Sequence, residues 1–325
     1  SRRRHTRFKC DWSSDVCSSD LVGASAVSLT ASTGGTAVTY VGANVDRRVS
    51  DEKLFNLSTR SQTGVGGQVL IAGFVISGTE AKPVLVRAIG PALTAFGLSG
   101  ALSAAKLEVV NEQGVTIKVG LDWGSASDAA AVADASARVG AFPLAKSSRD
   151  AAVLLNLPPG AYTAIVTGQN GASGVCLVEA YDATVGSIPN AQRLINMSSR
   201  ALVGSGEATL IGGFVISGSV PKRVLIRAVG PGLAQFGVPQ VLAKPQVILQ
   251  QNGRNGILAQ NAGYANTADA PAINAAATSV GAFPLVAGSA DAALLINLDP
   301  GAYTAQVVGV GGSTGAALIE IYEVK

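Results

Sequence analysis

The chain is poor in the side chains on which most enzyme sites depend. Its 325 residues include one His, three Cys and two Trp, and only 5% of the residues are aromatic and 14% charged. The His and two of the Cys lie near the start, as His5, Cys10 and Cys17. From residue 22 onward the sequence has no His and one Cys, Cys176. These absences narrow the possible functions before any motif is considered.

The first 21 residues, SRRRHTRFKCDWSSDVCSSDL, differ from everything that follows. They back-translate without a gap into a string that resembles a common short-read sequencing adapter, with its variable index around residues 8–10. The alternative is a natural basic leader. A secretory signal needs an apolar core of about 7–15 residues after the basic region, however, and none follows Lys9. We therefore interpret residues 1–21 as a translated adapter and predict that they are disordered.

The remaining sequence excludes several classes of site. Without His it cannot form a Ser-His-Asp or Cys-His nucleophilic site or a His-based zinc site, and one Cys cannot form an intrachain disulfide. We expect no catalytic residue, no cofactor and no metal, and we expect Cys176 to be a small buried side chain. Residues 1–21 hold five basic and three acidic side chains, so the net charge of +3 falls to near +1 without them. No basic cluster for nucleic acid is then left, and no apolar run approaches the roughly 18–20 residues of a membrane span.

A tandem repeat organises most of the chain. The segment from Asn56 to Gly97 aligns with Asn196 to Gly237 at an offset of 140, and both contain a version of LIAGFVISG. Each copy is far longer than a solenoid repeat and has the size of an ordinary domain. We predict four parts beyond the adapter: a remnant of a preceding β domain (22–53), a first β-sandwich repeat (54–184), a linker (185–192) and a second repeat (193–325).

Within each copy the pattern favours β-strands. Short β-branched runs such as KPVLVRAIGP and GVCLVEAYD are bounded by Gly, Pro or Asn. Pro159-Gly160 and Pro300-Gly301 suit a type II turn, and we expect each to join two strands in a hairpin. Residues 127–140 and 267–281 are each typical of one short helix. We therefore predict an all-β fold: two tandem jelly-roll-like β-sandwich domains, each with one short helix.

Charged residues shared by the two copies are the sharper signal, because most of the chain avoids charge. A charge on a half-buried strand normally needs a partner. We hypothesise structural ion pairs in which the Arg of each repeat pairs with one of two acids. The residues are Arg87 with Glu179 or Asp150 in the first repeat, and Arg227 with Glu320 or Asp291 in the second.

One other place is a candidate ligand contact. In Asp122-Trp123 the indole could stack on a sugar ring and the carboxylate could bind a hard cation. The second copy has Asn261 and Tyr264 there. One carboxylate is too few for a good calcium site, so the prediction of no metal stands. The glycines of TGVGG and VGSGE precede strands and therefore predict turns, not phosphate-binding loops.

The segments VLIRAVGP and PGAYTA are the most specific parts of a wider resemblance. From residue 54 to 325 the chain resembles a family of repeats that lie near the C-terminal ends of large secreted or surface proteins of environmental bacteria. Each repeat of that family has the size of an ordinary domain. The resemblance implies an extracellular or cell-surface β-module without assigned catalytic residues. Because we expect the sequence to begin inside a longer protein, a signal peptide is not observable in it.

We therefore expect a non-enzymatic structural or interaction module, such as a stalk, adhesin or sorting segment of a larger exoprotein. Its partner would be another protein or a cell-surface glycan, not nucleic acid. The alternative is a carbohydrate-binding accessory module of a secreted hydrolase, which predicts a sheet face with several exposed aromatic residues. An enzyme in its own right is the least favoured reading.

Overall fold

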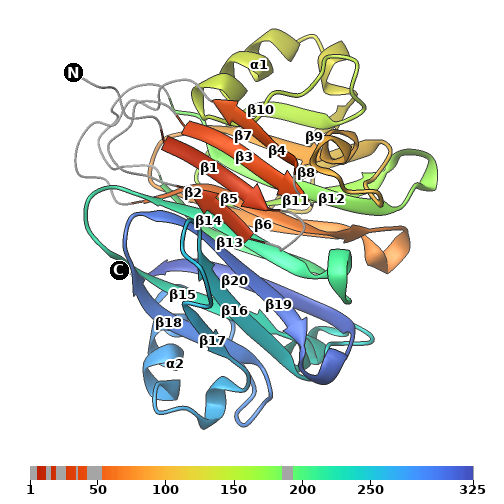
Figure 1. Ribbon diagram of the computed structural model, residues 1–325. Coiled ribbons are helices and arrows are strands. Elements are labelled where there is room, and N and C mark those ends of the chain that lie inside the picture. Colours follow the sequence, from red (N-terminus) through yellow and green to blue (C-terminus); the bar gives the residue numbers. More distant parts are fainter. Residues whose placement is uncertain are drawn as a thin grey trace.

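The computed structural model describes residues 6–11, 16–19, 27–33, 36–41, 53–184 and 193–324 (Figure 1). The first repeat consists of β5 (Lys53–Thr63), β6 (Leu70–Ser77), β7 (Lys82–Ile89), β8 (Ala105–Asn111), β9 (Thr116–Leu121), α1 (Ala129–Arg138), β10 (Ala151–Leu157), β11 (Gly160–Gly168) and β12 (Gly174–Asp182). The second repeat consists of β13 (Arg193–Val203), β14 (Leu210–Ser217), β15 (Lys222–Val229), β16 (Pro245–Gln251), β17 (Ala259–Asn261), α2 (Ala270–Ser279), β18 (Ala292–Leu298), β19 (Gly301–Gly309) and β20 (Gly315–Val324).

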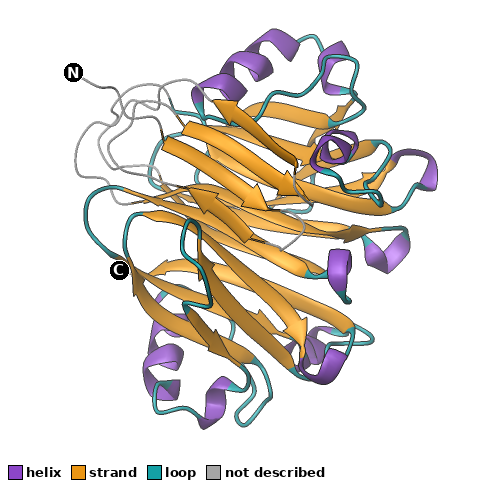
Figure 2. Cartoon of the chain, viewed as in Figure 1, coloured by secondary structure: helices purple, strands orange, loops and turns teal. Residues whose placement is uncertain are grey.

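Short 3₁₀ turns connect many of these elements. They are Gly66–Gln68, Pro91–Phe96, Trp123–Ser125, Gln169–Gly171, Gly206–Ala208, Pro231–Phe236, Tyr264–Asn266 and Val310–Gly312. The predicted all-β class is confirmed, because strands form nearly all of the regular structure and α1 and α2 are short (Figure 2). The two helices fall inside the predicted ranges 127–140 and 267–281.

Each repeat contributes two four-stranded antiparallel parts. In the first repeat the strand orders are β10-β7-β12-β5, which we call the β5 sheet, and β6-β11-β8-β9, which we call the β6 sheet. The second repeat has the equivalent orders β18-β15-β20-β13 and β14-β19-β16-β17. Alternate residues of β6, from Leu70 to Ile76, point into the core, as the period of two in a strand requires.

The two repeats share their sheets. Strand β5 pairs with β12 of its own repeat and with β14 of the other, and β13 pairs with β20 of its own repeat and with β6 of the other. Figure 1 shows these four strands, β5, β6, β13 and β14, side by side at the centre of the molecule, with α1 and α2 at opposite ends. The β5 sheet thus continues into the second repeat, and the β6 sheet does the same. One apolar core extends through both repeats.

The outer face of the β5 sheet carries a second apolar layer. Leu85 of β7 and Tyr181 of β12 pack there against Trp123 and Val132. Farther along, Ile89 and neighbouring strand residues pack against the 3₁₀ turn at Pro91–Phe96. Because apolar groups cover both faces of β12, every residue of this strand is buried. The charged residues of these strands therefore lie in an apolar environment.

One expectation about the turns is wrong. Pro159-Gly160 does not close a hairpin, because β10 pairs with β7 while β11 pairs with β6 and β8. The turn instead carries the chain from one sheet to the facing one, and Pro300-Gly301 does the same between β18 and β19. Turn residues specify a reversal of the chain direction, but they do not specify which strands pair afterwards.

A separate sheet precedes the repeats. It has the order β2-β1-β3-β4 and consists of β1 (Thr6–Asp11), β2 (Val16–Ser19), β3 (Val27–Thr33) and β4 (Thr36–Val41). Strands β1 and β2 lie within residues 1–21, and Trp12 and the other positions of that segment lie outside the described residues, as does the predicted linker, 185–192. The adapter origin and the disorder proposed for residues 1–21 stay predictions.

Candidate functional site

The first candidate residue, Arg87, lies in the middle of β7 and points to the outer face of the β5 sheet. Its neighbours Val86 and Ala88 point into the core, whereas Leu85 and Ile89 share the outer face with Arg87. The strand register places Arg87 directly opposite Glu179 of β12. Residues directly opposite on one face of an antiparallel pair have adjacent side chains. The alternation of the two strands therefore brings these two charges together.

The structure brings Arg87 and Glu179 into a buried ion pair. The Glu179 Oε2 atom lies 2.9 Å from Arg87 Nε and 2.7 Å from Nη2. The third nitrogen, Nη1, donates to the Phe142 carbonyl oxygen at 2.7 Å, and the guanidinium carbon lies 4.5 Å from the centre of the Phe142 ring. The Tyr181 hydroxyl donates to the other oxygen of Glu179 at 2.9 Å. Both groups are thus bound by side chains and backbone of the protein itself.

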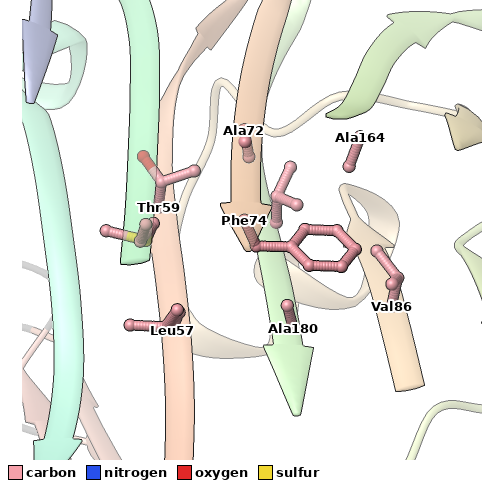
Figure 3. A pocket seen from close by; sticks show the side chains of 10 residues that line it. Leu57, Thr59, Ala72, Phe74, Val86, Ala164 and Ala180 are labelled. Atoms are coloured by element: carbon pink, nitrogen blue, oxygen red, sulfur yellow. The ribbon is translucent and has the colours of Figure 1, made fainter. Parts of the chain in front are cut away.

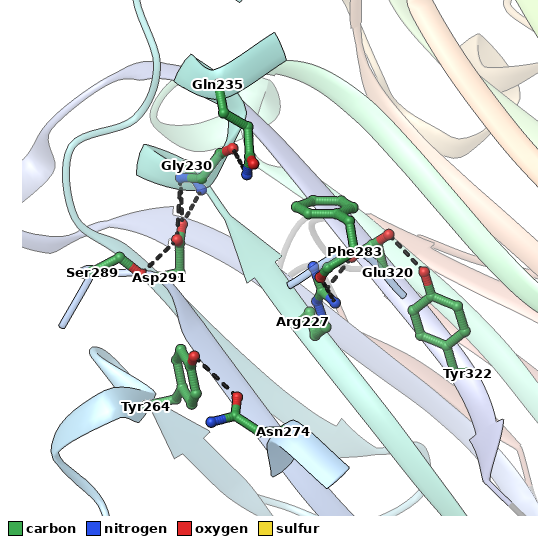
Figure 4. A network of polar contacts seen from close by, with 11 residues as sticks. Arg227, Gly230, Gln235, Tyr264, Asn274, Phe283, Ser289, Asp291, Glu320 and Tyr322 are labelled. Atoms are coloured by element: carbon green, nitrogen blue, oxygen red, sulfur yellow. Dashed lines mark hydrogen bonds and ion pairs between the residues drawn. The ribbon is translucent and has the colours of Figure 1, made fainter. Parts of the chain in front are cut away.

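The second repeat has the same arrangement. Arg227 Nε lies 3.0 Å from Glu320 Oε2, and Arg227 Nη1 donates to the Phe283 carbonyl oxygen at 2.8 Å. Figure 4 shows the Phe283 ring stacked beside the guanidinium, with the Tyr322 hydroxyl pointing at Glu320. That hydroxyl donates to Glu320 Oε1 at 2.7 Å. The repetition of the ion pair, of the bond to the Phe carbonyl oxygen and of the Tyr hydroxyl bond indicates a structural element of the repeat.

The other candidate acids, Asp150 and Asp291, do not pair with an Arg. Asp150 Oδ1 accepts the backbone N–H of Gly90 at 2.8 Å, and its other oxygen accepts the Ser148 hydroxyl. Asp291 accepts the N–H groups of Gly230 and Gly232 and the Ser289 hydroxyl (Figure 4). Each acid therefore fixes the start of a 3₁₀ turn after β7 or β15. Buried N–H groups need such acceptors, because an unmade hydrogen bond is costly.

Burial is the largest influence on the pKa of Glu320, Asp150 and Tyr322. It raises the pKa of Glu320, and the nearby Arg227 guanidinium opposes that rise. It also raises the pKa of Asp150, against the hydrogen bonds from Ser148 and the backbone. The pKa of Tyr322 is raised by burial and by the Glu320 charge, so its hydroxyl keeps the proton that it donates to that carboxylate. These shifts arise within a packed layer and not beside an open cleft.

A second buried ion pair escaped the sequence analysis. Lys82 Nζ lies 2.8 Å from Asp182 Oδ2, and Lys222 Nζ lies 2.9 Å from Glu323 Oε1 in the second repeat. Lys82 begins β7 and Asp182 ends β12, so the pair joins the ends of two neighbouring strands. Charges at strand ends are usually solvated, which is why neither residue stood out. The sequence signal that could have revealed this pair is that a Lys and an acid occur at equivalent positions of both repeats.

The candidate ligand contact in the first repeat is divided between core and surface. Trp123 is only 4% exposed, and its indole N–H donates to the Ala145 carbonyl oxygen at 3.0 Å. It therefore presents no ring face on which a sugar could stack. Asp122 lies at the surface, where Gln169 donates to its Oδ1 atom at 3.2 Å and Arg149 lies 3.5 Å away.

The equivalent residues of the second repeat are also used internally. Tyr264 is 2% exposed and donates to Asn274 Oδ1 at 3.2 Å (Figure 4). Asn261 Oδ1 accepts the backbone N–H of Ala293 at 3.1 Å, which ties β17 to β18. The structure therefore does not assemble these four residues into one binding surface. It gives Trp123 and Tyr264 equivalent places under the helices.

A gap in the shared core offers no room for a ligand. Figure 3 shows a space beside Phe74, lined by apolar side chains of both repeats such as Val86 and Met197. Its volume is about 10 Å³, which is at or below the roughly 10–15 Å³ that one water molecule needs. Within the described part of the chain, no three His, Cys, Asp or Glu side chains gather as a metal site would require. No helix among the described residues is long and apolar enough to cross a membrane.

The chain matches no protein-family model and no curated protein. What it does must therefore follow from its own residues and fold.

Proposed function

We propose that the chain is a non-enzymatic structural or interaction module, from the C-terminal end of a larger bacterial exoprotein that acts outside the cell or on its surface. One observation carries this proposal. In each repeat the strand Arg binds a buried Glu, as Arg87 does with Glu179, and the nearby buried Asp binds backbone N–H groups. An enzyme keeps such groups available to a substrate. Here they lock neighbouring strands together.

The proposed fold of each repeat is a jelly-roll-like β-sandwich domain. Eight strands form two facing sheets of four, in the orders β10-β7-β12-β5 and β6-β11-β8-β9. Consecutive strands mostly alternate between the two sheets, as in a double Greek key. A spacer or attachment segment needs no chemistry beyond such a fold, although the fold by itself does not specify a function. The extracellular location follows from the resemblance of residues 54–325 to repeats of secreted and surface proteins.

The shared sheets suit a module that bears load. Strand β5 lies between β12 of its own repeat and β14 of the other, so separating the repeats requires both ladders at the junction to break. We expect single-molecule pulling on the whole chain to give one unfolding event for both repeats. The released length would be about 900 Å, from roughly 3.3–3.6 Å per extended residue. Two events, each of half that length, would contradict a shared load-bearing unit.

The rival function is carbohydrate binding. It requires exposed aromatic rings, and the two aromatic side chains at the candidate site, Trp123 and Tyr264, are buried. We expect no binding to a glycan array. Saturable binding to one polysaccharide class that survives removal of residues 1–21 would overturn the proposed function in favour of the rival.

A further inference from the structure

The two repeats meet through two pairs of equivalent strands, and one of these pairs is almost identical in sequence. Strand β6 reads LIAGFVIS and β14 reads LIGGFVIS, so they differ only at Ala72 and Gly212. The strands that pair with them, β5 and β13, share Leu, Asn, Ser and Arg at equivalent positions of their first eight residues. Each repeat therefore carries both halves of the junction, a β5-type strand and a β6-type strand.

Both halves of the junction use the same register. Leu194 faces Ile76, and Ser198 faces Gly73. In the other junction Leu54 faces Ile216 and Ser58 faces Gly213, and in both junctions a register shift falls between the Leu and the Asn two positions later. A Cβ atom at Gly73 would lie 2.5 Å from Ser198 Oγ, and one at Gly213 would lie 2.5 Å from Ser58 Oγ. The same close contact thus occurs on both sides.

Equivalent residues also meet each other at the centre. Leu54 pairs with Leu194, and the Thr59 hydroxyl donates to Ser199 Oγ at 2.9 Å in a buried contact. A residue that touches its own counterpart lies on a two-fold axis. The junction is therefore isologous: each repeat offers the same patch to the other.

We propose that this junction accepts a repeat from a second copy of the chain, so that the second repeat of one chain pairs with the second repeat of another. The occupant follows from the strands themselves. Strand β13 now lies against β6, and β14 repeats seven of the eight residues of β6. A second copy would place Ser198 against Gly213 and Ser199 against Ser199, and each of these contacts already has a counterpart within the chain.

The proposal goes beyond the proposed function, because it concerns how modules join and not what they bind. Within one chain the partner repeat is present at high effective concentration, so the internal pair forms first. A second copy competes once the covalent link is cut, or where a repeat lacks a neighbour in its own chain. Pairing of this kind would join exoprotein chains through continuous sheets. Glycan binding could be found or not found without bearing on it.

The test uses the whole protein with a protease site inserted between residues 185 and 192. After cleavage, isotopically labelled and unlabelled samples are mixed, re-equilibrated in mild denaturant and examined by native mass spectrometry. Hybrid complexes of labelled first repeat with unlabelled second repeat show that exchange has occurred. We expect complexes of two second repeats to reach roughly a tenth to a quarter of the total, a quarter being the limit for equal affinities. Exchange without such complexes overturns the proposal, as does separation into folded single repeats.

Two variants locate the contact. In a pair of second repeats the contact of Ser198 with Gly213 occurs twice, whereas the natural pair contains Gly213 only once. We expect Gly213→Val to remove most of the pairs of second repeats while natural pairs persist. Gly212→Ala, the matched control, makes β14 identical to β6 and should leave them. Equal effects of the two variants, or no effect of Gly213→Val, would place the contact elsewhere and overturn the proposal.

Discussion

The two repeats keep one junction strand almost unchanged and differ in length at the outer ends of the same sheets. At the junction β6 and β14 differ in one residue of eight. At the outer ends of the same sheets β9 has six residues and β17 only three. Strand β9 and the residue before it also expose four apolar side chains: Val115, Ile117, Val119 and Leu121. Of the four junction strands, β6 and β14 thus keep their sequence, whereas the strands at the outer ends of the sheets diverge in length.

The largest expected effect comes from the buried Arg that the repeats have in common. We expect Arg87→Leu and Arg227→Leu each to lower the free energy of unfolding by about 3–5 kcal/mol, because a buried carboxylate is left without its partner. Denaturant titration followed by circular dichroism measures it. Both variants should fall in this range, because each removes the only Arg that pairs with the buried Glu of its repeat in the ion pairs described above.

A double variant distinguishes a lost charge pair from lost packing. Replacing both partners, as in Arg87→Leu with Glu179→Leu, removes the unpaired charge and should recover much of the loss. If the double variant were less stable than Arg87→Leu alone, the pair would owe its role to packing around Phe142. Clearly unequal effects of the two single Arg variants would show that the surroundings of the ion pair in the second apolar layer differ between the repeats.

The next effect tests the contrast between the junction and the outer edge. We expect Gly73→Val to cost about 1–3 kcal/mol, because the added atoms overpack the contact with Ser198. Val119→Thr on the exposed strand β9 should change stability by less than about 0.5 kcal/mol. Thermal unfolding of the two variants gives the comparison. A costly Val119→Thr would mean that the outer strand is also held by a partner.

The strands and the ion pairs were largely predictable, and the junction was not. Alternating apolar residues in segments such as KPVLVRAIGP place a strand and its buried face, and an Arg amid them implies an acidic partner. The same alternation gives no information about which strand lies alongside. Strands β5 and β13 were not predicted as strands at all. Their Ser, Thr and Arg residues lack a clear apolar period, although several of them, such as Thr59, Arg60 and Ser61, are buried.

The candidate ligand residues failed to form a surface for a related reason. In a sequence that has few aromatic residues, Trp123 and Tyr264 stand out as candidates for stacking on a ligand. The second apolar layer over the β5 sheet, built with α1 and α2, needs large side chains at these two positions. That layer comes from segments far apart in the chain, so a pattern of neighbouring residues cannot reveal it. Only the burial of the two rings in the structure distinguishes a core role from a ligand contact.

A smaller effect should appear at alkaline pH. Burial, together with the Asp299 charge, raises the pKa of Tyr303 from 10.0 to about 12. Between these values the unfolded chain has released the phenol proton and the folded chain still holds it, so stability falls as pH rises from 10 to 12, by up to about 1.4 kcal/mol per pH unit. Tyr303→Phe should flatten that slope, and Tyr162→Phe in the first repeat should flatten it less. Unfolding free energies measured at several pH values test this. Equal slopes in all three proteins would contradict the assignment.

The smallest effect is expected where one repeat has Cys176 and the other has Ala317. Both residues are fully buried in the common core, so the core already accepts either side chain at this place. Cys176→Ala and Ala317→Cys should each change the free energy of unfolding by less than about 1.5 kcal/mol. Burial also raises the pKa of the Cys176 thiol, which keeps it protonated and slow to react. A thiol reagent should therefore label Cys176 only as fast as the protein unfolds. Rapid labelling of folded protein would mean that the last strand of the first repeat opens independently of its neighbours β5 and β7.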